Sequence, residues 1–518
     1  LDPASGFDLT QVPPAFREFF ESVLTQYFDQ LPLQDKRRLA IGLFSLPIDS
    51  SNEAKLAAIL NNSGPAIQKL FQLFGEDVKS ERVASVMKEL KNQIKPFDTA
   101  LAIAKIERDL GGNIDELFSD FGDGPIAAAS VGQVYLATTR ETDEDVVVKV
   151  MRPNLRDRAA REIELLKELA PTRGTRKIVE RLEESLLQEL DFRNESRNLE
   201  TGQAVYWKPQ KGISLIAANE LFETSSDVLV MERAYEKPIN KFGGADLPVK
   251  SEALATFLET WYDEALFGKG FFHADLHAGN IFFETKSPSR CFSSGRKYQM
   301  TLIDFGNCGQ LSRAEQKGII NFILGSATGS TTLIVNAFLD LCPTMTQEQA
   351  VRFQKDLLEI FAMKLDASET CNLIVNKAIE RELGLPKNFI LFNRGRAFLE
   401  NQIRDTNEEI QAWDPRGTTP LKDATAIFGS LLKWRLGQDF LKSAIGVQDF
   451  SDAVLDPETL VTIADHYIVG TDEEEEEEEP ASYWQDEPPP INLGSMFGAG
   501  REDDSDEESG EGSTCTIS

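Results

Sequence analysis

The sequence has few of the residues that build disulfide frameworks or zinc sites. Of its 518 residues, 5 are cysteine and 3 are histidine. The cysteines are scattered, and no pair has the C-x-x-C spacing of a zinc or redox motif. We therefore expect neither a disulfide-stabilised domain nor a structural zinc site, and a reducing compartment is the simplest interpretation.

Basic residues are also scarce. Lys and Arg number 54 against 85 Asp and Glu, so the formal net charge is −31. Residues 471–518 contain 17 acidic residues and a single basic one, Arg501, and carry −16 of that charge. This balance argues against a nucleic-acid binder, which needs a basic surface, and against general electrostatic attachment to anionic lipid. A local basic patch could still contact lipid.

Long apolar runs are absent as well. The longest stretch without a charged residue, 318–339, contains many Ser, Thr, Asn and Gly residues. It is too polar for a membrane span, and we expect it to form buried helices.

The rest of the composition is that of a folded protein. Hydrophobic residues make up 41% of the chain, and its length suits two to four domains. Periodicity and charge predict a mainly helical N-terminal extension (1–125), a strand-containing lobe (126–235), a mainly helical lobe (236–470) and a disordered acidic tail (471–518). Apolar spacing of helical type in the first segment is found at 17–28, 55–61, 66–74, 83–94 and 99–109. In the second segment, short apolar runs at 126–138 and 145–151 predict strands, and a helical pattern covers 156–200 with one interruption near 171–174.

The strongest functional signal is the segment His273-Ala-Asp275-Leu-His277-Ala-Gly279-Asn280. An apolar strand and then Asp304-Phe305-Gly306 follow it. An H-x-D loop with an Asn five residues after the Asp, followed by D-F-G, is the catalytic layout of the kinase superfamily. The sequence therefore predicts a phosphoryl-transfer site.

The residue types fit that chemistry. Phosphoryl transfer needs a carboxylate that orients or deprotonates the acceptor, and Asp275 is the candidate. Mg²⁺ prefers oxygen ligands, which Asn280 and Asp304 supply. His273 is predicted to organise the loop by hydrogen bonding and not by titration.

A phosphate-binding loop is predicted upstream. The kinase frame G-x-G-x-x-G-x-V is filled here so that two of its three glycines are alanines, which makes the loop stiffer. A lysine on the following strand, Lys149, is predicted to hold the α- and β-phosphates. The loop residues predicted to contact the nucleotide are Ala127, Ala128, Ala129, Ser130, Val131, Gly132, Gln133 and Val134.

The lysine needs a carboxylate partner from a helix. Glu189, Asp191 and Glu195 are the candidates, and the spacing places Asp191, Glu195 and Asn198 on one helical face. A solvated charged surface is the simpler alternative for such a run. The apolar strand 227–233 is predicted to lead into the adenine hinge, with the following residues nearest the base: Met231, Glu232 and Ala234.

Taken together, these residues resemble the UbiB/ADCK-type (ABC1-like) atypical kinases over about residues 60–340. In that family an alanine-rich loop replaces the glycine-rich one. The family's E-x-D motif matches Glu189 and Asp191, and its helix glutamate matches Glu195, which implies an ion pair with Lys149.

The family also carries a K-x-G-Q motif in an N-terminal helical extension that lies over the active site. Here Lys69 and Gln72 match it, but Phe71 stands where the family has Gly. The resemblance implies a regulatory role for the two motifs, that is, for Lys69, Gln72, Glu189 and Asp191.

The resemblance implies an α+β, bilobal protein-kinase-like fold with an N-terminal helical extension, a helical C-lobe and a disordered acidic tail. It implies ATP or ADP and Mg²⁺ as cofactors, and an ATPase or lipid kinase activity that supports the biosynthesis or handling of ubiquinone and other prenyl-quinone lipids. The expected partners are a nucleotide, such a lipid, and a membrane surface or lipid-biosynthesis complex, and not a nucleic acid. The expected location is intracellular, peripheral to an organellar (mitochondrial or plastid) membrane or a bacterial inner membrane.

Two other functions stay open. A small-molecule phosphotransferase of the aminoglycoside or choline kinase type also uses an H-x-D loop, and a non-catalytic nucleotide-binding scaffold could recruit partners through the acidic tail. A conventional protein kinase is not expected. Only residues 307–311 separate the D-F-G from a helix start at Ser312, where Glu315 completes a capping box, so no long activation segment can form.

Overall fold

The computed structural model describes residues 14–47, 49–75, 96–286, 296–381, 383–415, 424, 426–431 and 435. All of these belong to one compact unit, residues 1–469. The predicted helix 83–94 and the predicted acidic tail lie outside the described residues. The boundaries of the four predicted segments stay predictions.

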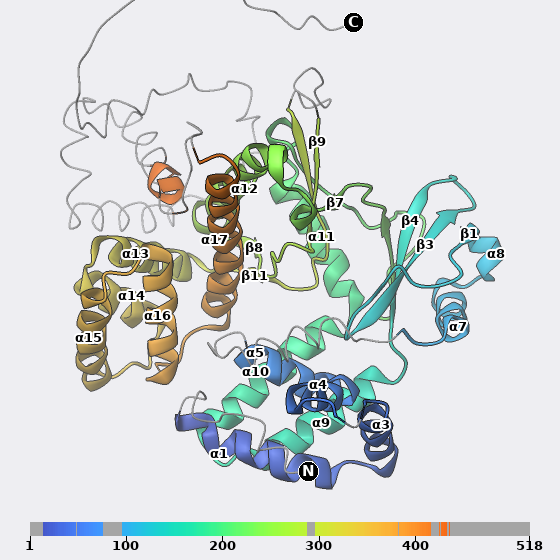
Figure 1. The fold of residues 1–518 in the computed structure, drawn as a ribbon, viewed down its shortest axis with the longest axis horizontal. Coiled ribbons are helices and arrows are strands. Elements are labelled where there is room, and N and C mark those ends of the chain that lie inside the picture. The colour runs from blue at the N-terminus through green and yellow to red at the C-terminus, as the bar shows by residue number, and fades with distance from the viewer. Residues whose placement is uncertain are drawn as a thin grey trace, which may run out of the picture. The chain divides into compact units, whose positions relative to one another are not determined.

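The N-terminal extension is helical, as its apolar spacing predicts. It consists of α1 (Pro14–Ser22), a π-helical turn (Val23–Tyr27), α2 (Phe28–Gln30), α3 (Leu33–Phe44), α4 (Asn52–Asn62) and α5 (Pro65–Gly75). These helices pack against α9 (Leu155–Leu169) and α10 (Arg173–Glu189), two helices that follow the first sheet in sequence (Figure 1).

The first sheet has the strand order β1-β3-β4-β6, with all neighbours antiparallel. Its strands are β1 (Phe118–Phe121), β2 (Ala127–Ala128, paired with β3), β3 (Gly132–Thr139), β4 (Asp145–Met151) and β6 (Val228–Glu232). One predicted strand at 126–138 is in fact two, because a tight turn separates β2 from β3. β1 is a short strand within residues 1–125, which the sequence predicts to be mainly helical.

Two short helices, α7 (Thr99–Leu110) and α8 (Ile114–Leu117), precede the first sheet. Alternate residues of β4, Val146, Val148 and Val150, form a separate apolar cluster with Ala102 and Ile106 of α7. The residues between them, among them Lys149, lie on the opposite face of the sheet because side chains alternate along a strand.

α11 (Phe192–Tyr206) connects this sheet to the second lobe. The segment 156–200, predicted to be helical with one interruption, forms α9, α10 and α11, with a second break at residues 190–191. Asp191 lies in that break as the N-cap of α11, where its side chain accepts a hydrogen bond from the Arg193 amide. The prediction that Asp191 shares a helical face with Glu195 is therefore wrong.

The second lobe has two small sheets among helices. The four-stranded sheet has the order β5-β10-β9-β7, and β8 pairs with β11. Its strands are β5 (Ile213–Leu215), β7 (Lys237–Pro238), β8 (Phe271–His273), β9 (Ile281–Thr285), β10 (Tyr298–Leu302) and β11 (Cys308–Gln310). Its helices are α12 (Leu247–Tyr262), α13 (Arg313–Thr328), α14 (Thr331–Leu341), α15 (Gln347–Ala362), α16 (Ala367–Glu380) and α17 (Lys387–Trp413).

The predicted helix start at Ser312 is confirmed, with a capping box to Glu315. The uncharged stretch 318–339 forms α13 and α14, which are largely buried as expected. Within the described residues, no helix combines the length and hydropathy needed to cross a lipid bilayer. The mixed, two-lobed kinase-like architecture predicted from the sequence is confirmed.

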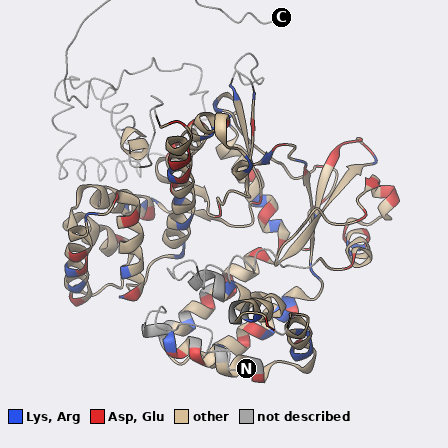
Figure 2. Cartoon of the chain, in the orientation of Figure 1, with Lys and Arg blue, Asp and Glu red and all other residues tan. Residues whose placement is uncertain are grey.

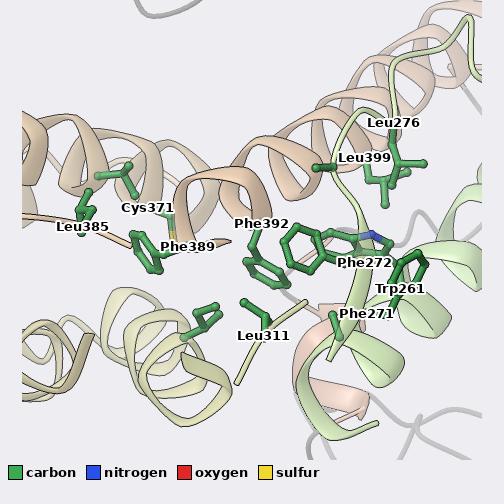
Figure 3. Close-up of a cluster of buried hydrophobic side chains, with 14 of the residues drawn as sticks. Trp261, Phe271, Phe272, Leu276, Leu311, Cys371, Leu385, Phe389, Phe392 and Leu399 are labelled. Carbon is green, nitrogen blue, oxygen red and sulfur yellow. The ribbon is translucent and has the colours of Figure 1, made fainter. Parts of the chain in front are cut away.

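The main core of the second lobe lies directly behind β8, the strand that leads into the H-x-D loop. Figure 3 shows Trp261, Phe272 and Phe392 packed together where α12, β8 and α17 meet. The rings of Trp261 and Phe392 stack with centroids 4.7 Å apart, and Phe272 meets Phe392 edge-on at 5.6 Å. This packing fixes the strand that ends in His273.

Candidate functional site

Lys149 lies at the centre of the site. It projects from β4, and its Nζ is 2.8 Å from both carboxylate oxygens of Glu195 and 3.1 Å from Oδ1 of Asp304. Glu195 comes from the first turn of α11 and is 3% exposed. The structure thus brings together the three residues that the sequence predicts as the lysine, its helix partner and the metal ligand.

The three charges set one another's protonation. Burial raises the pKa of the Glu195 carboxyl to about 7, against the pull of Lys149. Burial works against ionisation of Asp304 too, but Lys149 outweighs it and lowers the pKa of Asp304 to about 2, while its carboxylate is 46% exposed. Burial would lower the pKa of Lys149, yet Asp304 and Glu195 together raise it above its ordinary value. At neutral pH, Lys149 is therefore cationic and Asp304 anionic.

The D-F-G segment is held by α11. Asp304 has a left-handed backbone with φ of 58°, which a non-glycine residue rarely adopts and which often marks a functional turn. The Asn198 side chain donates a hydrogen bond to the Phe305 carbonyl at 2.9 Å. A Cβ at Gly202 would lie 2.5 Å from the Phe305 ring, so only glycine allows this close approach of helix and ring.

The catalytic loop is organised around His273. Its Nδ1 accepts a hydrogen bond from the Asp275 amide at 3.1 Å, and its Nε2 donates to the Ile303 carbonyl at 3.3 Å. Burial lowers the pKa of His273, which keeps the imidazole neutral, as this pair of hydrogen bonds requires. The geometry matches the organising role expected from the sequence.

Asp275 and Asn280 are linked through the loop backbone. The Asn280 amide nitrogen donates to the Asp275 carbonyl at 2.9 Å, which commits one end of that side chain. Asp275 also has a neighbour that sequence analysis missed: Arg394 of α17, whose Nη2 is 3.5 Å from Asp275 Oδ1. Neither Arg394 nor Asn198 stands in a kinase motif that the sequence analysis used.

The residues present fit a Mg²⁺ ion. Asp304 offers a half-exposed, ionised carboxylate. The side-chain carbonyl oxygen of Asn280 accepts no hydrogen bond among the described residues, because only its side-chain nitrogen is engaged. Mg²⁺ usually takes only one or two protein carboxylates, with phosphates and water as its other ligands. Accordingly, the described residues contain no cluster of three or more His, Cys, Asp or Glu side chains that could hold a metal by themselves.

Residues 89–338 match the family model of the ABC1 atypical kinase-like domain. The chain carries an ABC1 atypical kinase-like domain. This match confirms the resemblance to the UbiB/ADCK-type family that the sequence motifs indicate.

Curated relatives agree. The chain is 30% identical over 310 residues to the "Probable protein kinase UbiB" of Edwardsiella ictaluri (strain 93-146), covering 57% of this chain and 55% of the relative. Identity is 33% over 290 residues with the protein of the same name from Pseudomonas putida F1 (52% and 51% covered). It is 29% over 279 residues with "Protein ACTIVITY OF BC1 COMPLEX KINASE 8, chloroplastic" of Arabidopsis thaliana (51% and 35% covered). The chain thus spans about half the length, or less, of these relatives.

A solved structure from Mycobacterium tuberculosis, described as the complex of Rv3197 with erythromycin, is also similar. It aligns with a TM-score of 0.41 at 18% identity, over 70% of this chain and 96% of the solved one. A likeness of this degree carries no argument about fold or ligand.

The alanine-rich loop of the ABC1 domain is a tight turn between β2 and β3. The Ala129 amide donates to the Gly132 carbonyl at 2.8 Å, which leaves Ser130 and Val131 at the tip. A Cβ at Gly132 would lie 2.5 Å from the Val150 carbonyl oxygen, which explains why this position of the glycine frame is still glycine. Val134 pairs with Lys149 across the sheet and so lies on its face.

One predicted loop residue of the ABC1 domain points away from the cleft. Gln133 alternates with Val134 along β3, and its buried side chain exchanges hydrogen bonds with the backbone of Phe97, at 3.0 and 3.2 Å. It also donates to the Tyr135 hydroxyl. The prediction that Gln133 contacts the nucleotide is therefore wrong as far as its side chain is concerned.

The predicted hinge residues also divide between the two faces of the sheet. Met231 pairs with Val147, two residues from Lys149, and lies on the lysine's face. Glu232 is exposed, and its carboxylate accepts a hydrogen bond from the Ala217 amide at 3.0 Å. Ala234 follows the strand and is partly buried against the main core.

The two motifs that the resemblance singles out meet where α5 of the extension contacts α10 of the ABC1 domain. Lys69 of α5 forms an ion pair and hydrogen bond with Glu189 at the end of α10, and both side chains are largely buried, 11% and 19% exposed. Asp191 is engaged elsewhere: its hydrogen bonds with Arg193 lower the pKa of its carboxyl. Gln72 and Phe71 lie in α5, but their side chains are outside the described residues.

Proposed function

We propose that this chain is an atypical kinase-like ATPase, an ATP-dependent phosphotransferase that binds a Mg-nucleotide and supports the biosynthesis or handling of ubiquinone or other prenyl-quinone lipids. The observation that carries the proposal is Lys149 held between Glu195 and Asp304. The lipid class rests on the resemblance of the sequence motifs to the UbiB/ADCK-type family, which the ABC1 match and the UbiB relatives support. We further propose that the chain works at the surface of an organellar or bacterial inner membrane.

Each residue has a role in this proposal. The Lys149 ammonium would bind the α- and β-phosphates of ATP or ADP, and Glu195 would hold the ammonium in place. Asp304 and Asn280 would hold Mg²⁺, which neutralises charge on the phosphates when bound. Asp275 would orient the acceptor hydroxyl or water and take its proton.

The segment after the D-F-G supports a lipid or water acceptor over a peptide. Cys308 pairs with His273 and Gln310 with Phe271, so the segment is a strand on the edge of the catalytic strand. α13 begins at Arg313. Protein kinases bind their peptide on a longer activation segment, for which this arrangement has no room.

The test is ATP hydrolysis in the presence of Mg²⁺, measured with and without liposomes that carry a quinone headgroup mimic. Wild-type protein should hydrolyse ATP slowly and respond to the quinone liposomes. Asp304→Asn should lose at least about 100-fold in kcat, since it removes charge stabilisation at the transferred phosphoryl group.

Asp340→Asn, an exposed substitution of the same chemistry on α14, is the matched control and should keep full activity. Nucleotide binding in a thermal-shift assay without any turnover above Asp304→Asn would overturn the enzyme proposal in favour of a scaffold. Fast phosphorylation of a soluble alcohol with no liposome response would overturn the lipid part alone.

A further inference from the structure

A second cavity lies between the N-terminal extension and the start of α9. Its volume is about 550 Å³. Ser130, at the tip of the alanine-rich loop, lines it, but Lys149, Asp275 and Asp304 do not. One face of α3 lines it at the helical spacing of Gln34, Arg38 and Ile41. The size is that of a pocket for an organic ligand and exceeds what a single ion needs.

Four arginines line this cavity: Arg38, Arg152, Arg158 and Arg161. Only one carboxylate lines it, that of Asp35, which is 3.4 Å from Arg38 and 3.7 Å from Arg158. Arg161 is exposed and has no ion pair among the described residues. The cavity is therefore strongly positive in a protein whose net charge is −31, and Figure 2 shows basic residues on both α3 and α9.

A second carboxylate, that of Glu162, lies 3.9 Å from Arg158 Nε but does not line the cavity. Glu162 of α9 is 3% exposed and accepts hydrogen bonds from the Tyr27 hydroxyl and the Ala66 amide. These contacts fasten the extension to α9. Four arginines set against the two carboxylates of Asp35 and Glu162 still leave a formal charge of +2 at the cavity.

The first turn of α9 opens into the same space. Asn154 and Leu155 line the cavity, and the Asn154 side chain does not cap the helix. The free amide groups and the positive end of the 15-residue helix favour an anion there. Arg158 and Arg161 lie further along the same helix and add two positive charges near its N-terminal end.

We propose that this cavity binds the phosphate group of an organic ligand, either a phosphorylated small molecule or a phospholipid headgroup. A guanidinium group can donate two parallel hydrogen bonds to two oxygens of a phosphate. The uncapped N-terminal end of α9 adds backbone N–H donors. The lining also includes Leu46 and Phe97, which suit an organic remainder. On α3, Ile41 at the cavity and Phe44 nearby are 71% and 84% exposed.

The proposal goes beyond the proposed function, since it concerns a different cavity and needs no turnover. Binding of glycerol 3-phosphate is measured by calorimetry, and binding to vesicles of phosphatidylglycerol or of phosphate-free digalactosyldiacylglycerol by co-sedimentation. Arg38→Gln combined with Arg161→Gln should weaken binding of a phosphate probe about tenfold or more, because charged hydrogen bonds are lost. Both side chains reach solvent, so the fold should persist.

Ser45→Asp, which adds a negative charge at the exposed rim, should weaken binding in the same way without touching an arginine. Lys149→Met and the exposed Arg352→Gln should bind phosphate probes like the wild type. Binding of glycerol 3-phosphate assigns a soluble ligand, and binding only to phosphatidylglycerol vesicles assigns a lipid headgroup. The proposal fails if no probe binds, if the arginine variant binds normally, or if Lys149→Met alone abolishes binding.

Discussion

Lys149 satisfies two carboxylates with one positive charge. Glu195 is buried and holds the ammonium with both oxygens, whereas Asp304 is half-exposed and touches it with one. Burial raises the pKa of Glu195 despite Lys149, whereas Lys149 lowers the pKa of Asp304 despite its burial, so the two acids titrate apart. The arrangement keeps Asp304 ionised and accessible for an incoming cation.

The raised pKa of Glu195 predicts a pH-dependent stability. Its ordinary pKa is 4.5 and its folded pKa is about 7. The folded state therefore binds the extra proton between these values, and the stability that Glu195 contributes is present below pH 4.5 and lost as the pH rises through 7. From pH 4.5 to 7, the wild type should lose on the order of 3 kcal/mol of unfolding free energy relative to Glu195→Gln.

Urea unfolding at several pH values measures this difference. The exposed substitution Glu348→Gln on α15 is the control, and its stability should run parallel to that of the wild type over this range. If the unfolding free energies of Glu195→Gln and of the wild type also run parallel over this pH range, Glu195 stays ionised in the folded protein.

Arg394 predicts a positioning role for the helix behind the catalytic loop. Its guanidinium lies 3.5 Å from Asp275 and over the Phe398 ring, so it contacts the carboxylate from α17. Arg394→Ala should lower kcat about tenfold and leave the KM for ATP unchanged, and Arg394→Lys should restore part of kcat. Steady-state kinetics separates the two constants.

Arg404→Ala, an exposed change on the same helix, should leave kcat as it is. An equal change in KM and kcat for Arg394→Ala would point to a collapsed cleft and contradict the positioning role.

At the scale of residues, a sequence motif identifies functional side chains when they lie close together in the chain. Asp275 and Asn280 lie five residues apart in a loop, and their motif identifies them without a structure. Arg394 reaches Asp275 only through the packing of α17, which no local pattern encodes. Gln133 is misassigned because a one-residue step along a strand reverses the face of the sheet.

At the scale of elements, a buried ion pair joins α10 to the N-terminal extension. The Lys69–Glu189 pair ties α5 to the end of α10, one break before the helix that carries Glu195. A double-mutant cycle with Lys69→Met and Glu189→Gln should give a coupling of about 1–2 kcal/mol, because both side chains are largely buried. Urea unfolding of the four proteins gives the value.

The exposed pair Lys377–Glu380 on α16 is the matched comparison. Its cycle should give only about 0.2–0.5 kcal/mol, as is usual for surface pairs within a helix. Equal couplings for the two pairs would mean that Lys69 and Glu189 do not hold the elements together.

The sequence predicts helices and strands best where their hydrophobic pattern extends over many residues. The helical spacing at 99–109 gives α7, and the apolar run at 145–151 gives β4 with its exact bounds. β1 has only four residues, and its place is fixed by pairing with β3, which lies further along the chain. Strands of three residues such as β5 and β8 show no period at all, so tertiary pairing alone defines them.

The described part of the chain has two apolar clusters on opposite faces of the first sheet. The smaller contains ten buried residues around α7 and the outer face of β4, and the larger includes the extension and the second lobe. Ile106 is fully buried in α7. Ile106→Ala would leave a cavity within the smaller cluster, so it should speed amide exchange in α7 and β1 and leave α12 unchanged.

Hydrogen exchange followed by mass spectrometry resolves these segments. Leu101→Ala on the exposed side of the same helix should change none of them. Equal acceleration in α7 and α12 after Ile106→Ala would mean that the two clusters unfold as one unit.

The paired strands β8 and β11 have a consequence for inhibitor chemistry. Phe305 is fully buried, T-stacked on His273 at 4.7 Å, and followed after two residues by a strand that is hydrogen-bonded to the catalytic strand. Drugs that require this phenyl ring to swing out of its pocket would have to break that pairing first. Compounds directed at this chain should therefore be designed for the ring-in state, with their selectivity drawn from the alanine-rich turn and the helices of the extension.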